Sequence, residues 1–235
     1  MKVIILAGGL GTRLSEYTKT IPKPMVTVGG KPLILHIMTL YAKYGFKDFY
    51  LAVGYKGHII KKYFKNKKFF DWKINTIDTG AKTMTGGRIK RLKKFIGNET
   101  FMMTYGDGLS TVNLKKLLAF HKKNKKIATL TAVRPPARFG GIKIIGNKVK
   151  YFKEKSKLDE GWINGGFFIL EPKIFEYIKS DNTFFEREPL EKLTKQKQLS
   201  AFRHFDFWKC MDTKRDRDLL EEFFKKKRNN KTEKK

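Results

Sequence analysis

The chain has 235 residues, of which 40% are apolar and 20 are phenylalanine, so it is long enough to bury a substantial core. Its 52 lysine and arginine residues and 22 acidic residues give a formal charge of +30, which admits nucleic acids, membrane surfaces and phosphorylated substrates as partners. A single cysteine, Cys210, excludes an internal disulfide framework and a cysteine-rich zinc site, and the absence of a long apolar run predicts no membrane span, so we expect a cytoplasmic protein without membrane contact.

The first part of the chain alternates between strand and helix patterns. Residues 2–7 are almost entirely aliphatic, which is typical of a strand buried on both faces of a parallel sheet. Further strands are expected at 48–54, 72–77, 99–105 and 127–133, and helices at 32–44, 57–64, 88–96 and after the capping residue Asn113. This alternation predicts an α/β protein, a three-layer α/β/α sandwich with a Rossmann-like, mainly parallel sheet.

Past Pro135-Pro136 the pattern changes to shorter elements. The segments 142–145 and 148–153 predict a hairpin, because Gly146-Asn147 between them is a two-residue turn signal. Strands are expected at 162–170 and 199–204, and helices at 172–178, at 187–195 and from near Thr213. We expect a single domain over 1–224, with 135–224 as a small antiparallel extension of 1–134, and no repeat of β-helix type.

Most of the positive charge lies on predicted helix faces or in the tail. The tail 225–235 holds seven basic residues and one acid, and we expect it to be disordered. Many of the other lysines, such as Lys61 and Lys62 or Lys115 and Lys116, lie on predicted helices. Dispersed lysines of this kind are typical of a solvated face, so we expect no nucleic acid partner.

A glycine-rich loop follows the first strand, where open α/β sheets bind ligands. Its residues 8–13, Gly-Gly-Leu-Gly-Thr-Arg, lack the third glycine of a dinucleotide fingerprint and the Gly-Lys-Ser/Thr of a P-loop. Backbone N–H groups in such a turn can still converge on a phosphate, and Arg13 can add a forked cation. The alternative is a glycine turn that serves only tight geometry.

Ten residues farther on, Lys23 stands between Pro22 and Pro24. Each proline fixes its own φ, and Pro24 biases Lys23 toward an extended backbone, so we expect a stiff stem that can aim an ammonium group. The alternative is a solvated lysine in a surface loop.

Seven stretches in this order resemble the sugar-phosphate nucleotidyltransferase family over residues 1–224: "GGLGTRL", "KPM", "TMTGGR", "TYGDGLS", "WINGGFF", "EREPLE" and "FWKCMDTKRD". Within that family they resemble the members that use CTP and glucose 1-phosphate. The resemblance implies Mg²⁺-assisted, in-line attack of the sugar phosphate on the α-phosphorus of CTP, which gives CDP-glucose and pyrophosphate. It also implies a nucleotide-binding part at 1–134 and a sugar-binding part at 135–224, without a C-terminal β-helix.

The resemblance also assigns site residues. The cytidine would lie on Leu6, Ala7, Gly8, Gly9 and Leu10. The triphosphate would contact Gly11, Thr12, Arg13 and Lys23, and the pocket would be completed by Thr83, Gly87, Arg88 and Gly106. The sugar phosphate would be held by Glu154, Lys155, Asn164 and Gly165, for which a charged surface strand and a bulge are the alternatives.

Two aspartates are candidate metal ligands. Asp107 lies in Gly-Asp-Gly at the end of a predicted strand and Asp212 in Met-Asp-Thr, and carboxylate oxygens suit Mg²⁺. A simple turn at Asp107 and a helix cap at Asp212 are the alternatives. The resemblance implies that both bind the metal, and that Arg13, Lys23 and Asp107 are catalytic.

Three questions stay open at this point. The loop reads a base mainly through its backbone, so UTP or dTTP, or another sugar 1-phosphate, remains an alternative. A nucleic-acid-binding protein on the same fold is a second class of function, but it predicts loss of Asp107, Asp212 or Lys23, and all three are present. The short, lysine-rich region 65–72 leaves a homo-oligomer open.

Overall fold

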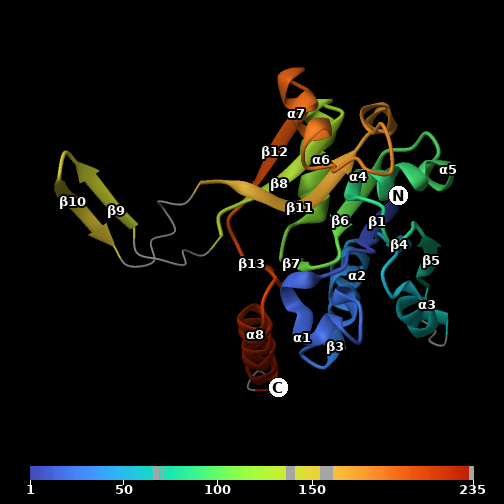
Figure 1. Cartoon of the computed structure of the whole chain (residues 1–235), viewed down its shortest axis with the longest axis horizontal. Coiled ribbons are helices and arrows are strands. Elements are labelled where there is room, and N and C mark those ends of the chain that lie inside the picture. Colours follow the sequence, from blue (N-terminus) through green and yellow to red (C-terminus); the bar gives the residue numbers. More distant parts are fainter. Residues whose placement is uncertain (66–68, 70, 136–140, 154–160, 233–235) are drawn as a thin grey trace.

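A mixed seven-stranded sheet forms the centre of the protein (Figure 1). The computed structural model describes residues 1–65, 69, 71–135, 141–153 and 161–232. In sheet order the strands are β12 (Leu199–His204), β8 (Ala128–Val133), β11 (Ile163–Leu170), β6 (Phe101–Tyr105), β1 (Lys2–Ala7), β4 (Asp48–Val53) and β5 (Lys73–Asp78). Only β11 among them runs antiparallel to its neighbours, which confirms the mainly parallel sheet.

Helices cover both faces of this sheet, because its strands are apolar on both sides. In β1, Val3 and Ile5 join the cluster packed by α2 (Leu33–Lys43), α3 (Gly57–Lys65) and α6 (Leu114–Asn124). On the other face, Ile4 and Leu6 join the cluster packed by α4 (Thr85–Arg91), α5 (Lys93–Ile96), η3 (Pro172–Tyr177) and α7 (Glu188–Lys195). The three-layer sandwich is therefore confirmed.

A second, two-stranded ladder joins distant parts of the chain. The strand β7 (Gly108–Ser110) directly follows the turn after β6 and pairs antiparallel with β13 (Trp208–Cys210), with Cys210 opposite Gly108. The last helix, α8 (Lys214–Thr232), starts just beyond β13. This ladder brings the start of α8 to the carboxyl ends of β1 and β6.

The remaining elements are short. They are η1 (Thr12–Leu14), α1 (Ser15–Thr18), η2 (Lys23–Met25), β2 (Thr27–Val28), β3 (Lys31–Pro32), β9 (Gly141–Ile145) and β10 (Lys148–Lys153). The strands β9 and β10 form the expected hairpin, in which Gly146 has a φ of 59°, and Figure 1 shows it standing apart from the central sheet.

Several boundaries differ from the sequence expectation. The helix expected from Arg88 begins at Thr85 and is interrupted at Leu92, and the segment expected as a helix from Pro172 is a 3₁₀ helix. The tail was expected to be disordered, but α8 continues through Thr232, because lysine and arginine are good helix formers and no proline interrupts them. Among the described residues, no helix is both long and apolar enough to cross a bilayer.

Candidate active site

The glycine loop has a defined conformation at the end of β1. Gly11 adopts a left-handed conformation with φ 67°, and the Thr18 hydroxyl donates to its carbonyl over 3.1 Å. A Cβ on Gly11 would lie 2.8 Å from Thr18 Cγ2 and 3.1 Å from Lys23 Cβ. Glycine is therefore needed here both for the backbone angle and for the stem of Lys23 that packs beneath the loop.

Arg88 supports the glycine loop through hydrogen bonds. Arg88 is only 4% exposed, and its five hydrogen bonds within the described residues all go to uncharged oxygens. The shorter ones reach Gly8 O and Gly80 O at 2.8 Å and Thr79 Oγ1 at 2.7 Å. Burial lowers the pKa of Arg88. We infer that Arg88 lines the cavity mainly as a support for the loops after β1, β4 and β5.

Lys23 packs against the glycine loop at Gly11, and its ammonium is paired with two aspartates. Nζ donates to Asp107 Oδ2 over 2.8 Å and to Asp212 Oδ1 over 2.7 Å. Burial alone lowers the pKa of Lys23, but the charge of Asp107 and the hydrogen bonds that the ammonium donates to both aspartates outweigh it, so the net pKa is raised. The ammonium is therefore a permanent cation held between two carboxylates.

The backbone around Lys23 differs from the expected extended stem. Pro22 is extended, with φ −69° and ψ 147°, whereas Lys23 begins the 3₁₀ helix η2. The turn is closed by hydrogen bonds from Met25 N to Pro22 O at 2.8 Å and from Val26 N to Lys23 O at 3.1 Å. These bonds outweigh the local bias that Pro24 imposes, and the stem is stiff because it is a closed turn.

Asp107 is placed by a tight contact between β6 and β1. Gly106 N donates to Leu6 O over 2.9 Å, and a Cβ on Gly106 would lie 2.8 Å from that same oxygen. Asp107 O in turn accepts from Met211 N over 2.9 Å. The main chain of Asp107 is thus tied to the segment that carries Asp212.

A capping box places Asp212, and the sequence reasoning missed it. Thr213 Oγ1 accepts from Asp216 N, and Asp216 Oδ2 accepts from the N–H groups of Thr213 and Asp212 at 2.9 and 3.1 Å. Lys209 Nζ pairs with the other Asp216 oxygen at 2.5 Å. Asp212 therefore does not cap α8; its carboxylate faces Lys23 and Arg13, and Arg13 Nη1 donates to Asp212 Oδ2 over 2.9 Å. The Thr-x-x-acid spacing of residues 213–216 was a readable signal for this cap.

Two cavities meet at Asp107. The first has about 290 Å³, and the residues expected to hold the nucleotide that line it are Leu6, Ala7, Gly8, Gly9, Gly11, Thr12, Arg13, Lys23, Thr83, Arg88 and Gly106. Leu10 and Gly87 lie outside this lining: Leu10 is 53% exposed, and Gly87 packs against Asp181, whose carbonyl oxygen would be 2.5 Å from an added Cβ.

The second cavity, of about 230 Å³, contains the described part of the expected sugar site. Asn164 and Gly165 line it together with Trp208, whose Nε1 donates to Gly165 O over 2.8 Å. Tyr105 and Asp107 line both cavities, and neither Tyr105 nor Trp208 was foreseen. The other two expected sugar ligands, Glu154 and Lys155, lie outside the described residues.

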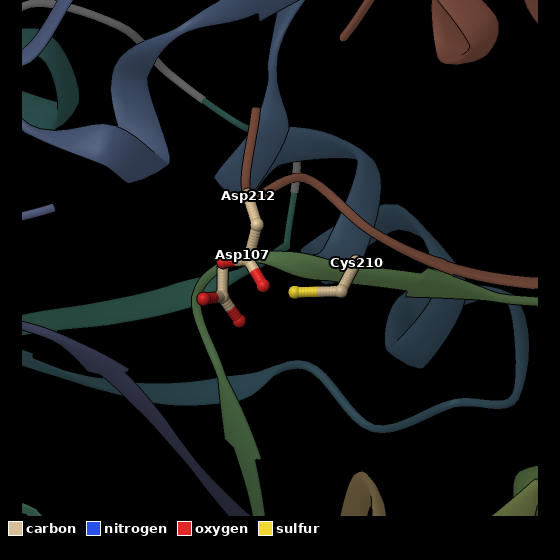
Figure 2. Close-up of side chains that lie close together, drawn as sticks. All are labelled: Asp107, Cys210 and Asp212. Atoms are coloured by element: carbon tan, nitrogen blue, oxygen red, sulfur yellow. The ribbon is translucent and has the colours of Figure 1, made fainter. Parts of the chain in front are cut away.

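The groups at this junction fit a divalent cation. Figure 2 shows the carboxylates of Asp107 and Asp212 and the thiol of Cys210 pointing toward one another, and one ligand atom from each lies within 4.8 Å of the others. Burial and the negative charge of Asp107 raise the pKa of Cys210, so the free thiol is protonated at neutral pH. Lys23 Nζ lies between the two carboxylates, so this position stabilises a positive charge.

Comparison with known proteins agrees with this geometry. Residues 2–227 match the nucleotidyl transferase family. The chain is 46% identical to the glucose-1-phosphate cytidylyltransferase of Salmonella typhimurium, over 96% of both chains, and 44% identical to the probable glucose-1-phosphate cytidylyltransferase of Bacillus subtilis, over 91% of this chain and 92% of that one. Among solved structures it resembles HddC from Yersinia pseudotuberculosis complexed with GMP-PN, with a TM-score of 0.75, 29% identity and coverage of 95% of this chain and 99% of that chain.

Proposed function

The chain belongs to the nucleotidyl transferase family, and from this premise we propose that it transfers a cytidylyl group from CTP to α-D-glucose 1-phosphate, giving CDP-glucose and pyrophosphate. The observation that carries the proposal is the position of Lys23, Asp107 and Asp212 where the two cavities meet. The similarity to glucose-1-phosphate cytidylyltransferases over almost the whole chain supports the choice of both substrates. Its single cysteine requires no oxidising compartment, and we place the activity in the cytoplasm.

In this proposal the nucleotide lies in the first cavity, over the glycine loop. The loop's N–H groups and the Arg13 guanidinium, whose side chain is 73% exposed at the cavity mouth, bind the triphosphate. Thr83 and Gly106 complete the pocket, and Arg88 fixes the loop by holding Gly8 O. The α-phosphate is then directed toward the junction at Asp107.

The sugar 1-phosphate lies in the second cavity, with Asn164 and Gly165 beside its hydroxyl groups. One of its phosphate oxygens attacks the α-phosphorus in line, a bond to phosphorus forms, and the bond to the leaving pyrophosphate breaks. No side chain needs to form a covalent bond, because such transfers depend on positioning and on offsetting charge. Lys23, whose ammonium a bound Mg²⁺ would displace from Asp107 and Asp212, supplies a cation to the phosphates where they meet.

Asp107 and Asp212 would hold Mg²⁺, which would offset the charge of the two anionic substrates and withdraw electron density from the α-phosphorus. Their carboxylates are placed for this by main-chain bonds, Asp107 through Met211 N and Asp212 through Asp216.

The proposal is tested by incubating the protein with Mg²⁺, one of CTP, UTP, dTTP, ATP or GTP, and one of a panel of sugar 1-phosphates, and measuring pyrophosphate release. CTP with glucose 1-phosphate should give the highest kcat/KM. The matched control is Asp107→Asn, which removes a ligand charge with little change in volume and should lose most turnover with an unchanged unfolding temperature. If no pair of substrates releases pyrophosphate, the transferase proposal is wrong. If another pair gives the highest kcat/KM, that pair replaces CTP and glucose 1-phosphate in the proposal.

A further inference from the structure

The segment between η3 and α7 leads into the motif "EREPLE", which has no part in the chemistry proposed above, and it borders the first cavity. Two neighbouring phenylalanines in this segment have different surroundings. Phe185 is fully buried in the core, whereas Phe184 is 39% exposed and lines the first cavity. Because ligand pockets are lined largely by apolar and aromatic side chains, the exposed ring of Phe184 is a candidate contact for the ligand of this cavity.

Main-chain hydrogen bonds tie this segment to the start of α4. Met84 N donates to Asp181 O over 2.8 Å, and Gly86 N donates to Thr183 O over 2.9 Å. A Cβ on Gly86 would lie 2.7 Å from Thr183 O, so glycine is needed for this close approach. The motif "TMTGGR", which contains Met84 and Gly86, thus positions the residue that directly precedes Phe184.

The side chain of Thr85 fixes the residues on the other side of Phe184. Its hydroxyl accepts from Phe185 N over 2.9 Å and donates to Glu186 Oε2 over 2.6 Å. Phe184 is therefore anchored through the residues before and after it, and its ring belongs to the same cavity wall as the start of α4.

A guanidinium group supports the ring of Phe184. The central guanidinium carbon of Arg187 lies 4.4 Å from the centroid of this ring, a distance at which a cation and an aromatic face attract each other. The guanidinium covers part of the ring, and the exposed remainder borders the cavity. The ring is therefore oriented before any ligand binds, which reduces the entropy that a stacked ligand would have to offset.

The charges around the first cavity indicate which part of a nucleotide this wall suits. The lining residues at the start of α4 and in the segment before α7 are uncharged, apart from Arg88, which is bonded to the loops: Thr83, Met84, Thr85 and Phe184. The other charged lining residues come from the glycine loop, η2 and the turn after β6: Arg13, Lys23 and Asp107. A triphosphate favours the charged groups, so the uncharged wall suits the nucleoside. Of the two cavities, Phe184 lines only the first, which separates it from the expected sugar site.

We propose that Phe184 stacks on the base of the bound nucleoside triphosphate and supplies much of the affinity for its nucleoside part. The inference rests on the proposed function in taking the first cavity as the nucleotide site. Every base has a π-face that can stack on an aromatic ring. Phe184 therefore strengthens the binding of nucleotides without selecting cytosine over the other bases.

The test is isothermal titration calorimetry of the full chain with CTP and, separately, with inorganic triphosphate, which has the same phosphates but no base. Both titrations contain Mg²⁺ and no sugar 1-phosphate, so no transfer occurs. In Phe184→Ala the affinity for CTP should fall by about 5- to 150-fold, the range for loss of one base–aromatic stack, while the affinity for inorganic triphosphate stays within about twofold. UTP should lose affinity by a similar factor.

Two further variants separate stacking from apolar bulk. Phe184→Tyr keeps the flat ring and should keep the CTP affinity, whereas Phe184→Leu keeps an apolar side chain without a ring and should lose affinity as Phe184→Ala does. The control is Phe205→Ala, a 74% exposed phenylalanine that lines neither cavity, which should change neither titration. Thermal unfolding without ligand checks that each variant is folded.

Full CTP affinity in Phe184→Ala or Phe184→Leu, an equal loss for CTP and inorganic triphosphate, or a loss in Phe184→Tyr as large as in Phe184→Ala would each overturn the stacking proposal. Binding of no nucleoside triphosphate by the unmodified chain would overturn it as well. Pyrophosphate release by the unmodified chain with a sugar 1-phosphate decides the transferase proposal separately. A chain that releases pyrophosphate but binds CTP equally well without the Phe184 ring would contradict only the stacking proposal.

Discussion

At the scale of single residues, Lys23 occupies the carboxylate oxygens that we propose as metal ligands. Its ammonium pairs with both Asp107 and Asp212, so we expect a divalent cation that binds there to displace it. Lys23→Met keeps much of the stem but removes the charge, so in the absence of nucleotide it should bind Mn²⁺ more tightly, by about tenfold or more, as expected for a carboxylate pair that loses a partly buried cation. Mn²⁺ binding followed by electron paramagnetic resonance measures this.

The same variant should lose about a hundredfold or more in kcat, which is typical for removal of one group that stabilises charge in the transition state. Lys62→Met, an exposed lysine on α3, is the control and should change neither quantity. Unchanged Mn²⁺ affinity in Lys23→Met would show that the ammonium and the metal do not share a site.

Substitution of Arg88 distinguishes between two roles of this residue, support of the glycine loop and direct contact with the nucleotide. Arg88→Lys keeps the charge, but its single ammonium cannot reach Gly8 O, Thr79 Oγ1 and Gly80 O together. Buried oxygens left without a donor cost about 1–3 kcal/mol, so the free energy of unfolding should fall by that amount while the KM for CTP rises. Chemical denaturation and steady-state kinetics measure the two effects.

Gly54→Ala should reproduce this result, because its Cβ would lie 2.4 Å from Arg88 Nη1 and displace the guanidinium. The control is Arg91→Lys on the same helix, an exposed arginine paired with Asp181. A higher KM with full stability in Arg88→Lys would assign Arg88 to direct contact with the nucleotide.

At the scale of elements, the start of α8 connects stability to the position of Asp212. Burial tends to raise the pKa of Asp216, but its hydrogen bonds to Lys209 and Thr213 lower it overall. A lowered pKa means that the folded state favours the carboxylate. This stabilisation is present above the ordinary aspartate pKa of about 3.9 and is lost as the pH falls through the lower value of the folded state.

Asp216→Asn should therefore cost about 1 kcal/mol at pH 7, as loss of a cap does, and the difference from the unmodified protein should shrink as the pH falls below the ordinary aspartate value of about 3.9. Turnover should fall as well, because asparagine has one acceptor oxygen where Asp216 uses two, one for Asp212 N and the other for Lys209 Nζ. Urea denaturation at both pH values measures this, and Asp218→Asn, an exposed residue of the same helix, is the control. A pH-independent difference would exclude the carboxylate as the cause.

The elements predictable from the sequence are those governed by local patterns. The limits of β1 follow from a run of aliphatic residues, and the cap at Asn113 follows from one side-chain acceptor. The pairing of β7 with β13 could not be read in this way, because it joins residues about 100 positions apart through short strands. Consequently, the sequence pointed to Asp107 and Asp212, but not to the capping box that orients one or to the cysteine beside them.

At the scale of the whole molecule, α8 has two features whose effects on activity and stability have to be measured separately: its positive charge and its packing against the core. Leu220 is buried in the core, Glu221 accepts from Gly29 N over 2.7 Å, and the ring of Phe224 stacks on His36 with centroids 4.2 Å apart. The first part of α8 thus packs against the segment that follows η2, and η2 is the turn that carries Lys23. Residues 228–235 add four basic residues and one acidic residue beyond these contacts.

Two truncations separate these roles. Removing residues 228–235 should change kcat/KM for CTP and the free energy of unfolding by no more than about twofold and 0.5 kcal/mol, the range of ordinary surface changes. Removing 219–235 should cost about 3 kcal/mol or more, because the buried Leu220 and the partly buried Phe223 and Phe224 are lost, and should lower kcat with it. Kinetics and chemical denaturation at constant ionic strength measure both. If the shorter truncation alone abolished transfer, the basic end of α8 would belong to the active site, and the reading of its lysines as a solvated face would be wrong.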